Sequence, residues 1–352
     1  MSHGLAVAED GLDRAVKAWL NAEPCVPDAI DCERASAEGV QWLLQPGADP
    51  AAQRQQLEGR KRLLQLELAE DRWLPALLAA AAARGLQALV IKGGALSRWL
   101  YPERGLRPRT DLDLWIPAAQ RQAWWQFLDA QGWRRTANAW GLWQQPEASF
   151  TPPEATLSWP IDLHWQISGR PALSKRLAFD EFYRRARRLA EHGDLAVPDP
   201  ADSLLIAVAH AFGHHRSRRT RLIWLLDMAL LWRQMPPEAK LEVSRRARAH
   251  GIASLIRSAL VEAHRRLDIE LDPDWLAAMD SAAQSEAWSS WLADAPSDWR
   301  LDWRSCDGSQ RLAIVKERLW PPADYLRQRY ASRAPDWWLR LRRLIDAARR
   351  RS

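Results

Sequence analysis

The spacing of apolar residues changes along the chain, and each change predicts a different kind of structure. From about residue 53 to residue 84 the apolar positions recur at helical spacing, and a shorter helical pattern covers residues 12–21. Pro75 lies inside the longer run and is expected to break or kink it into two helices. Gly85 is well placed to end the second helix. Residues 1–84 are therefore predicted to form a helical N-terminal segment.

Residues 85–170 carry the β patterns of the chain, separated by short helical ones. Pro117 and Gly132 stand where a helix would begin and end, which predicts a helix over residues 117–130. A second short helix is expected over residues 93–99. Together these patterns predict an α+β fold in which this region forms a small mixed sheet. Strands are predicted over residues 87–91, 111–116, 133–137, 141–145 and 156–167.

Beyond about residue 170 the apolar spacing is helical to the end, so residues 171–352 are predicted to form an all-helical C-terminal domain. Asp199-Pro-Ala-Asp202 is a strong start signal, with Asp as the N-cap and Pro at the first helical position. Its helix should reach about Gly213. Further helices are predicted over residues 222–233, 237–250, 252–267, 273–291 and 310–319.

The last helical pattern, residues 336–351, is basic and amphipathic. Such a helix is suited to a membrane surface or to RNA. Docking on the body of the protein is the commoner outcome, and it is the one we expect here. The apolar face would consist of Trp337, Leu341, Leu344, Ile345 and Ala348.

Composition narrows the class of protein. The 352 residues carry a formal net charge of +6, which favours polyanionic ligands, nucleotides as well as nucleic acids. No apolar run approaches the ~18 residues of a transmembrane helix, and the N-terminus lacks a secretory signal pattern. Cys25, Cys32 and Cys306 show no metal-type spacing. A cytoplasmic protein is expected. The 22 tryptophans are scattered, which favours packing roles over base stacking.

One motif joins a predicted strand to a helix through two glycines, Leu89-Val-Ile-Lys-Gly-Gly-Ala-Leu96. A glycine pair that opens a helix offers bare backbone N–H groups to a phosphate. Lys92, one of few lysines, adjoins the pair. Glycine pairs are also common in ordinary turns, so the motif alone does not decide between a phosphate site and a connection.

Carboxylates follow on two later strands. Asp111 and Asp113 alternate with Leu112, so their side chains share one face of a strand, ~6.6 Å apart. Asp is disfavoured in strands, although a solvent-facing edge would tolerate the pair. On a later strand Asp162 and His164 alternate in the same way. A phosphate cradle with three carboxylates suits magnesium-dependent phosphoryl or nucleotidyl transfer. His164 is a candidate contact for the substrate or its phosphates, and a hydrogen-bonded sheet histidine explains it equally well.

This set of motifs resembles the polymerase-beta-like nucleotidyltransferase superfamily. More narrowly, the chain is similar to the uncharacterised bacterial nucleotidyltransferase family, whose members often lie near natural-product and peptide-modification genes. The resemblance covers about residues 60–330. It is carried by Val90-Ile-Lys-Gly-Gly-Ala95, Leu100-Tyr-Pro, Leu106-Arg-Pro-Arg-Thr-Asp-Leu-Asp113, Ile161-Asp-Leu-His-Trp165, His210, Arg221-Leu-Ile-Trp-Leu-Leu-Asp227 and the segment from Leu319-Trp-Pro321 to Tyr330.

The resemblance implies a role for each matching position. Three carboxylates would bind two Mg²⁺ ions, and Asp162 would also help to deprotonate the acceptor hydroxyl. The chemistry would be in-line attack on the α-phosphate of a nucleoside triphosphate (NTP), ATP or another, with pyrophosphate leaving. Many members of the superfamily have serine where this chain has Gly94. The implied metal ligands are Asp111, Asp113 and Asp162, and the implied nucleotide-binding residues are Lys92, Gly93, Gly94, Arg107 and Arg109.

A second cluster lies in the helical part and includes His210, Arg221 and Asp227. His210 and His214 are four residues apart, which permits zinc binding, but no Glu stands at the protease base position. A basic loop that faces the NTP or an anionic acceptor is the functional interpretation. A solvated loop with a structural hydrogen bond between His210 and Asp227 explains the pattern equally well.

The first hypothesis is therefore a Mg²⁺-dependent nucleotidyltransferase that transfers a nucleoside monophosphate to a hydroxyl of an unknown small-molecule, peptide or protein acceptor in a biosynthetic pathway. The alternative is a catalytically inactive partner protein of the same fold that binds nucleotide or a polyanion. Three carboxylates on one face favour the enzyme, because they repel one another without a metal. An RNA-acting enzyme is disfavoured, since no RNA-binding motif is present.

Overall fold

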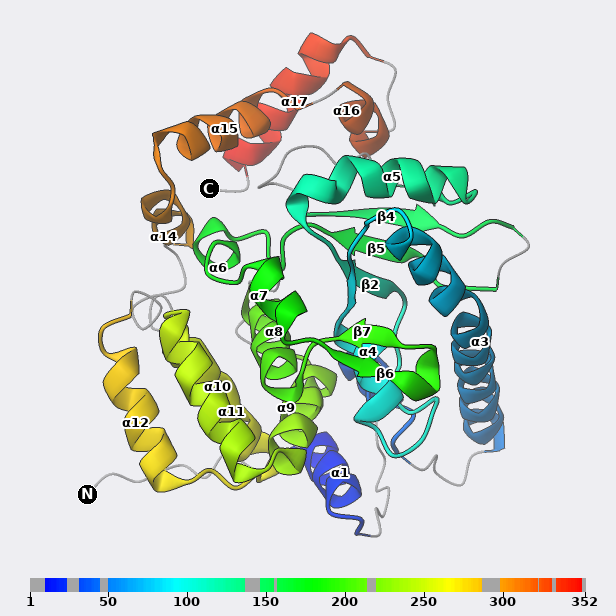
Figure 1. The fold of residues 1–352 in the computed structure, drawn as a ribbon, viewed down its shortest axis with the longest axis vertical. Helices are drawn as coiled ribbons and strands as arrows, with labels where there is room; N and C mark the ends of the chain where they lie inside the picture. The colour runs from blue at the N-terminus through cyan, green and yellow to red at the C-terminus, as the bar shows by residue number, and fades with distance from the viewer. Residues whose placement is uncertain are drawn as a thin grey trace.

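The computed structural model confirms the predicted α+β fold (Figure 1). A five-stranded mixed sheet lies between two clusters of buried apolar residues. Along the first strand Leu89 and Ile91 belong to the larger cluster, and Val90 belongs to the smaller one. The structure describes residues 10–23, 32–44, 50–136, 146–154, 157–213, 220–286, 298–321, 323–330 and 334–349.

Strand order brings the predicted carboxylates together. The sheet runs β1-β2-β5-β4-β3, and β2 and β5 are parallel while the other neighbours are antiparallel. In this register Asp113 lies opposite Asp162, and Ser149 flanks Asp162 on its other side. Side chains opposite each other point to the same face, so polar groups of three strands meet. The strands are β1 (Leu89–Val90), β2 (Leu112–Trp115), β3 (Arg134–Arg135), β4 (Glu147–Thr151) and β5 (Ile161–His164).

Strand β4 was not predicted from the sequence. It alternates buried Ala148 and Phe150 with half-buried neighbours, but alanine and serine have weak β propensity and hide the pattern. The strand predicted over residues 141–145 lies outside the described residues. Strands β1, β2, β3 and β5 fall within the predicted ranges and are shorter than them.

Pro75 was expected to break or kink the long helical run into two helices, and it does not break it, because α3 (Pro50–Ala82) runs through it as one element. Proline removes one backbone hydrogen bond from the helix. Leu74 and Leu77 on either side are buried in the apolar cluster of the sheet, which offsets that loss. Pro75 also packs tightly on Gly193, where a Cβ atom would lie 2.5 Å from the proline ring.

A β-hairpin interrupts the region that was predicted to be all helical. It consists of β6 (Arg187–Leu189) and β7 (Leu195–Val197), joined by the short 3-10 turn Ala190–His192. Leu195 and Val197 are buried in the apolar cluster of the sheet beside α3. The hairpin therefore extends the sheet side of the fold, and the C-terminal region is helical apart from it.

The remaining elements are helices, and those from residue 200 to residue 267 begin and end close to their predicted positions. The helix predicted over residues 273–291 begins as expected at Pro273 but ends at Ala283. Helix α9 (Leu222–Gln234) is central: residues 222–232 are all buried, as expected of a helix that is covered on every side. The other helices are α1 (Gly11–Leu20), α2 (Cys32–Glu38), α4 (Lys92–Trp99), α5 (Arg121–Ala130), α6 (Pro171–Ser174), α7 (Phe179–Arg184), α8 (Pro200–Gly213), α10 (Pro237–Ala249), α11 (Ala253–Leu267), α12 (Pro273–Ala283), α14 (Asp298–Ser305), α15 (Gly308–Leu319), α16 (Ala323–Tyr330) and α17 (Asp336–Arg349).

The apolar face predicted for the last helix is exposed. Trp337, Leu341 and Ile345 of α17 are 66%, 42% and 40% exposed, whereas Leu339 is fully buried. The helix packs beside α16 at the edge of the molecule (Figure 1). The expectation that this face docks on the body of the protein is therefore wrong for the residues that the structure describes. None of the helices in the described ranges is both long and apolar enough to cross a membrane.

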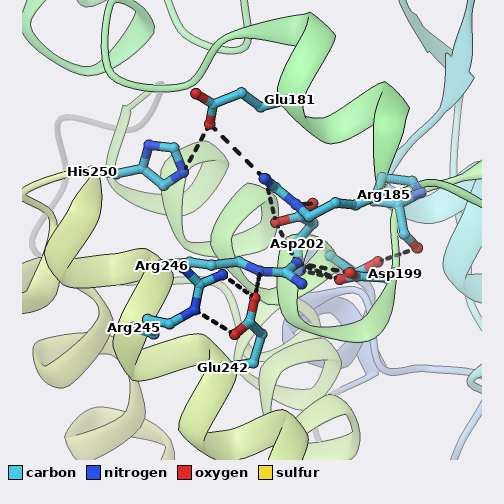
Figure 2. Close-up of polar contacts among 10 residues, drawn as sticks. Glu181, Arg185, Asp199, Asp202, Glu242, Arg245, Arg246 and His250 are labelled. Atoms are coloured by element: carbon cyan, nitrogen blue, oxygen red, sulfur yellow. Dashed lines mark hydrogen bonds and ion pairs between the residues drawn. The ribbon is translucent and has the colours of Figure 1, made fainter.

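A charged cluster ties three helices of the C-terminal region together (Figure 2). The Nη1 atom of Arg246 on α10 lies 2.8 Å from carboxylate oxygens of both Asp199 and Asp202, at the start of α8. Arg185, just after α7, donates to Asp202 from Nε at 2.8 Å. Glu242 accepts from Nε of Arg246 at 2.6 Å. Buried Asp202 is thus held by cations from two neighbouring elements.

Stability should depend on the ionisation of Glu242. A hydrogen bond from Arg245 has the largest effect on the pKa of Glu242. Burial opposes it, and with the further hydrogen bond from Arg246 the pKa is lowered to about 2, compared with about 4.3 in an unfolded chain. Its contribution is present above the unfolded value and is lost as pH falls from there towards 2. Between pH 7 and pH 3.5 the loss should be on the order of 1 kcal/mol.

Urea unfolding of the protein and of Glu242→Gln at the two pH values measures this contribution. The difference in unfolding free energy between the two proteins should shrink at pH 3.5. A difference that does not change with pH would mean that the pKa of Glu242 is the same in the folded and unfolded chains.

Candidate functional site

A cavity of about 1020 Å³ opens beside the carboxylates, between the sheet, α3 and the start of α9. Its walls contain most of the residues predicted for the site. Gly94 and His164 are not among the lining residues. The predicted residues that line it are Lys92, Gly93, Arg107, Arg109, Asp111, Asp113, Asp162, His210, Arg221 and Asp227.

The three aspartates converge on this cavity from two strands. Parallel pairing of β2 with β5 sets Asp113 opposite Asp162, and Asp111 directly precedes β2. Burial, together with the charges of Asp113 and Asp162, raises the pKa of Asp111 to about 6. Burial also raises the pKa of Asp162, although Ser149 donates a hydrogen bond to it. The carboxylates therefore repel one another, which favours a cation between them.

Asp113 already has cationic partners. The Nζ atom of Lys92 lies 2.8 Å from Oδ1 of Asp113, and Nε2 of His164 lies 2.7 Å from the same oxygen. Burial opposes the charge of Asp113, but Lys92 and His164 outweigh it and hold the pKa of Asp113 well below its usual range. Burial likewise opposes the charge of Lys92, and Asp113 nevertheless raises its pKa. Asp113 is thus an ionised carboxylate within an ion cluster of the chain itself.

Glu147 is the site residue that sequence reasoning missed. It lines the cavity, faces His164 across β4 and β5, and its Oε2 lies 3.0 Å from Nδ1 of His164. Burial lowers the pKa of His164, but Asp113 and Glu147, whose carboxylate oxygens lie 2.7 and 3.0 Å from its ring nitrogens, raise it to about 9. His164 is 1% exposed and therefore acts on the cavity through these two carboxylates. The alternation Glu147-Ala-Ser-Phe is the only sequence signal that could have revealed β4 and this residue.

The two glycines serve different purposes. A Cβ atom at Gly93 would lie 2.8 Å from Nη1 of Arg107, at the cavity wall. A Cβ atom at Gly94 would lie 2.8 Å from the side chain of Leu112. Gly94 therefore lets α4 approach the sheet closely, and a serine at this position would meet the side chain of Leu112.

The two predicted phosphate clamps are held in ion pairs. Arg107 donates from Nε and Nη2 to Asp227 at 3.2 and 2.6 Å, and the hydroxyl of Tyr101 donates to the same carboxylate. Arg109 pairs with Glu70, and its guanidinium lies 3.8 Å from the ring centroid of Trp159. Both arginines thus fix the loop that leads to Asp111, and neither guanidinium is available in this arrangement as an unoccupied clamp.

The opposite wall comes from the helical part of the chain. Arg221, at the start of α9, donates from Nε to the backbone oxygen of Ala37 and lies over the ring of Trp224. His210 meets the same ring edge-on. The structural hydrogen bond considered between His210 and Asp227 is replaced by the bonds of Asp227 to Arg107 and Tyr101. His214 lies outside the described residues.

The donor set suits a divalent cation in its chemistry, since carboxylate oxygens are the ligands that Mg²⁺ prefers. Of the three aspartates that line the cavity, Asp111 and Asp162 have raised pKa values. Across the ranges that the structure describes, however, no three Asp, Glu, His or Cys side chains are grouped as a ready metal site.

The segment that contains this site matches a known protein family. Residues 43–268 match the family described as uncharacterised nucleotidyltransferase, and this segment contains every residue predicted for the site. No curated protein matches the chain. The solution structure of the antibiotic-resistance factor ANT(2'')-Ia matches with 16% identity and a TM-score of 0.36, over 56% of this chain and 98% of that one. This likeness is too low to guide the assignment of individual residues.

Proposed function

Because the chain belongs to the family of uncharacterised nucleotidyltransferases, we propose that it transfers a nucleoside monophosphate from an NTP to a hydroxyl group of an acceptor, with the help of Mg²⁺. The observation that carries the proposal is the meeting of three aspartates with the glycine turn in one cavity. Asp111, Asp113 and Asp162 would hold the metal. When bound, Mg²⁺ would neutralise the charge that develops on the reacting phosphate and on the leaving pyrophosphate.

The triphosphate would lie between the glycine turn and the helical wall. The first backbone N–H groups of α4 belong to Lys92, Gly93 and Gly94, and free N–H groups at a helix start favour anions. Arg221 on the opposite wall supplies positive charge to the same cavity. His210 would contact the substrate beside it. Because Arg107 and Arg109 are engaged by Asp227 and Glu70, they would act by holding the loop in place.

The acceptor hydroxyl would attack the α-phosphate in line. Its oxygen forms the new P–O bond, pyrophosphate leaves with the electrons of the broken bond, and the proton passes to a carboxylate. Asp162 is suited to this step, because its raised pKa makes it a better proton acceptor than an ordinary aspartate. Ser149, which donates a hydrogen bond to Oδ1, fixes the position of that carboxylate. A small molecule, a peptide or a protein could supply the hydroxyl.

The second candidate function is a non-catalytic partner protein that binds nucleotide or a polyanion. One observation favours it: Lys92 and His164 neutralise Asp113 without any metal. Asp111 and Asp162 argue for the enzyme, since their repulsion finds no protein cation at salt-bridge distance among the described residues.

Transfer of label from α-³²P-NTPs to components of a cell lysate separates the two functions. With Mg²⁺ we expect labelled acceptor and released pyrophosphate for at least one of the four NTPs, and neither with EDTA in excess. NTP binding without transfer of label from any of the four would contradict the proposed enzyme and support the binding protein.

A further inference from the structure

Lys92 holds the position at which a metal ion would otherwise approach Asp113. We propose that Lys92 is a built-in cation of the carboxylate centre, which takes the place of the second Mg²⁺ expected from the sequence. Without nucleotide the site would then bind one divalent ion. This inference rests on the proposed function and adds to it the number of ions that the resting site accepts.

The backbone of Lys92 is the first evidence. Its φ angle is +52°, in the left-handed region that non-glycine residues rarely adopt because the side chain is strained there. Glycine would occupy this position without strain, and the two residues that follow are glycines. A lysine retained in a strained conformation beside a carboxylate centre is typical of a functional constraint.

The contacts of its side chain are the second evidence. The Lys92 side chain is 11% exposed and that of Asp113 is 8% exposed. Nζ of Lys92 and Nε2 of His164 both lie within 2.8 Å of the same Asp113 oxygen, Oδ1. A divalent ion could bind that oxygen only after displacing one of these donors. Among the described residues Asp113 is the one carboxylate at salt-bridge distance from Lys92, and the removal of a buried ammonium from it would be costly.

The charge of the whole cluster points the same way. Four carboxylates converge here, those of Asp111, Asp113, Glu147 and Asp162. Lys92 supplies one positive charge. His164 lies between Asp113 and Glu147, with Nε2 2.7 Å from one carboxylate and Nδ1 3.0 Å from the other. Negative charge remains for a divalent cation, which Asp111 and Asp162 would hold together with Oδ2 of Asp113, the oxygen that the hydrogen bonds of Lys92 and His164 leave open.

Titration with Mn²⁺ alone, followed by the EPR signal of the free ion, counts the sites without reference to activity. The unaltered protein should bind one Mn²⁺. Lys92→Met removes the ammonium at similar length and frees Oδ1, so a second site, or at least tenfold tighter binding, is expected. Lys92→Arg keeps the charge and is the matched control, with the stoichiometry of the unaltered protein.

Two Mn²⁺ ions on the unaltered protein would overturn the inference, and this count stands even if Lys92→Met does not fold. The inference would also be overturned if Lys92→Met and the unaltered protein gave the same Mn²⁺ titration, or if neither bound the ion. These outcomes are distinguishable from failure of the proposed function. A protein that binds one ion but never transfers label would contradict the enzyme and support the built-in cation. An active protein that binds two ions would support the enzyme and contradict the built-in cation.

Discussion

Asp111→Asn is expected to reduce nucleotidyl transfer by about a thousandfold, the largest effect that a single isosteric change should have on this chain. The substitution keeps the shape of the side chain and removes the charge that a metal requires. Since the pKa of Asp111 is raised to about 6 by burial and by its acidic neighbours, the neutral amide should fit the folded protein well. Transfer of ³²P to the acceptor, measured as an initial rate, reports the loss.

Asp180→Asn is the matched control, because Asp180 is an exposed aspartate on α7 that does not line the cavity. Its rate should equal that of the unaltered protein. Thermal shift adds a second readout: an NTP with Mg²⁺ should raise the melting temperature of the unaltered protein and of Asp180→Asn, but not of Asp111→Asn. Transfer by Asp111→Asn at an undiminished rate would exclude Asp111 from the reaction.

Asp227→Asn should have the largest effect on stability, about 3–5 kcal/mol of unfolding free energy. Arg107 is buried, and Asp227 balances its charge through two hydrogen bonds. Burial opposes the charge of Arg107, and Asp227 is what raises its pKa above the ordinary value. Without that carboxylate a guanidinium is left charged in the interior. Urea unfolding at pH 7 measures the difference.

Tyr101→Phe distinguishes the contribution of the neighbouring hydroxyl from that of the ion pair between Arg107 and Asp227. It removes the hydroxyl that donates to Asp227 at 2.6 Å and leaves the guanidinium contact intact, so a loss of only about 1 kcal/mol is expected. If Asp227→Asn were no more destabilising than Tyr101→Phe, the buried charge of Arg107 would have found another partner, and the loop before Asp111 would not depend on α9.

The features of the site that could be read from the sequence are local. A strand, a glycine turn and a helix follow one another directly, and Asp111 and Asp113 are two residues apart, so backbone periodicity alone predicts that their side chains share a face. The helices between residues 200 and 267 were predicted for the same reason: cap residues and apolar spacing lie within one element. Their ends are therefore close to the observed ones, whereas α14 and α16 were not predicted.

The features that could not be predicted depend on partners distant in sequence. Arg107 and Arg109 look like free cations beside an aspartate, yet the carboxylates that hold them are 120 and 39 residues away. Glu147 joins the site only because β4 pairs with β5, and no local pattern reports that pairing. Pro75 was misjudged for the same reason, since its packing against Gly193 is visible only in the folded chain.

The parallel pairing of β2 with β5 affects how many folded molecules have a correctly aligned carboxylate centre. In this register Leu112 lies opposite Ile161 and Asp113 opposite Asp162. A slip of one residue would turn Asp113 into the apolar cluster and Leu112 out of it, so a misaligned sheet would pay both penalties at once. Molecules that fold stably but carry a scrambled centre should therefore be scarce. Nearly every molecule of this protein that folds should also have its three aspartates correctly placed.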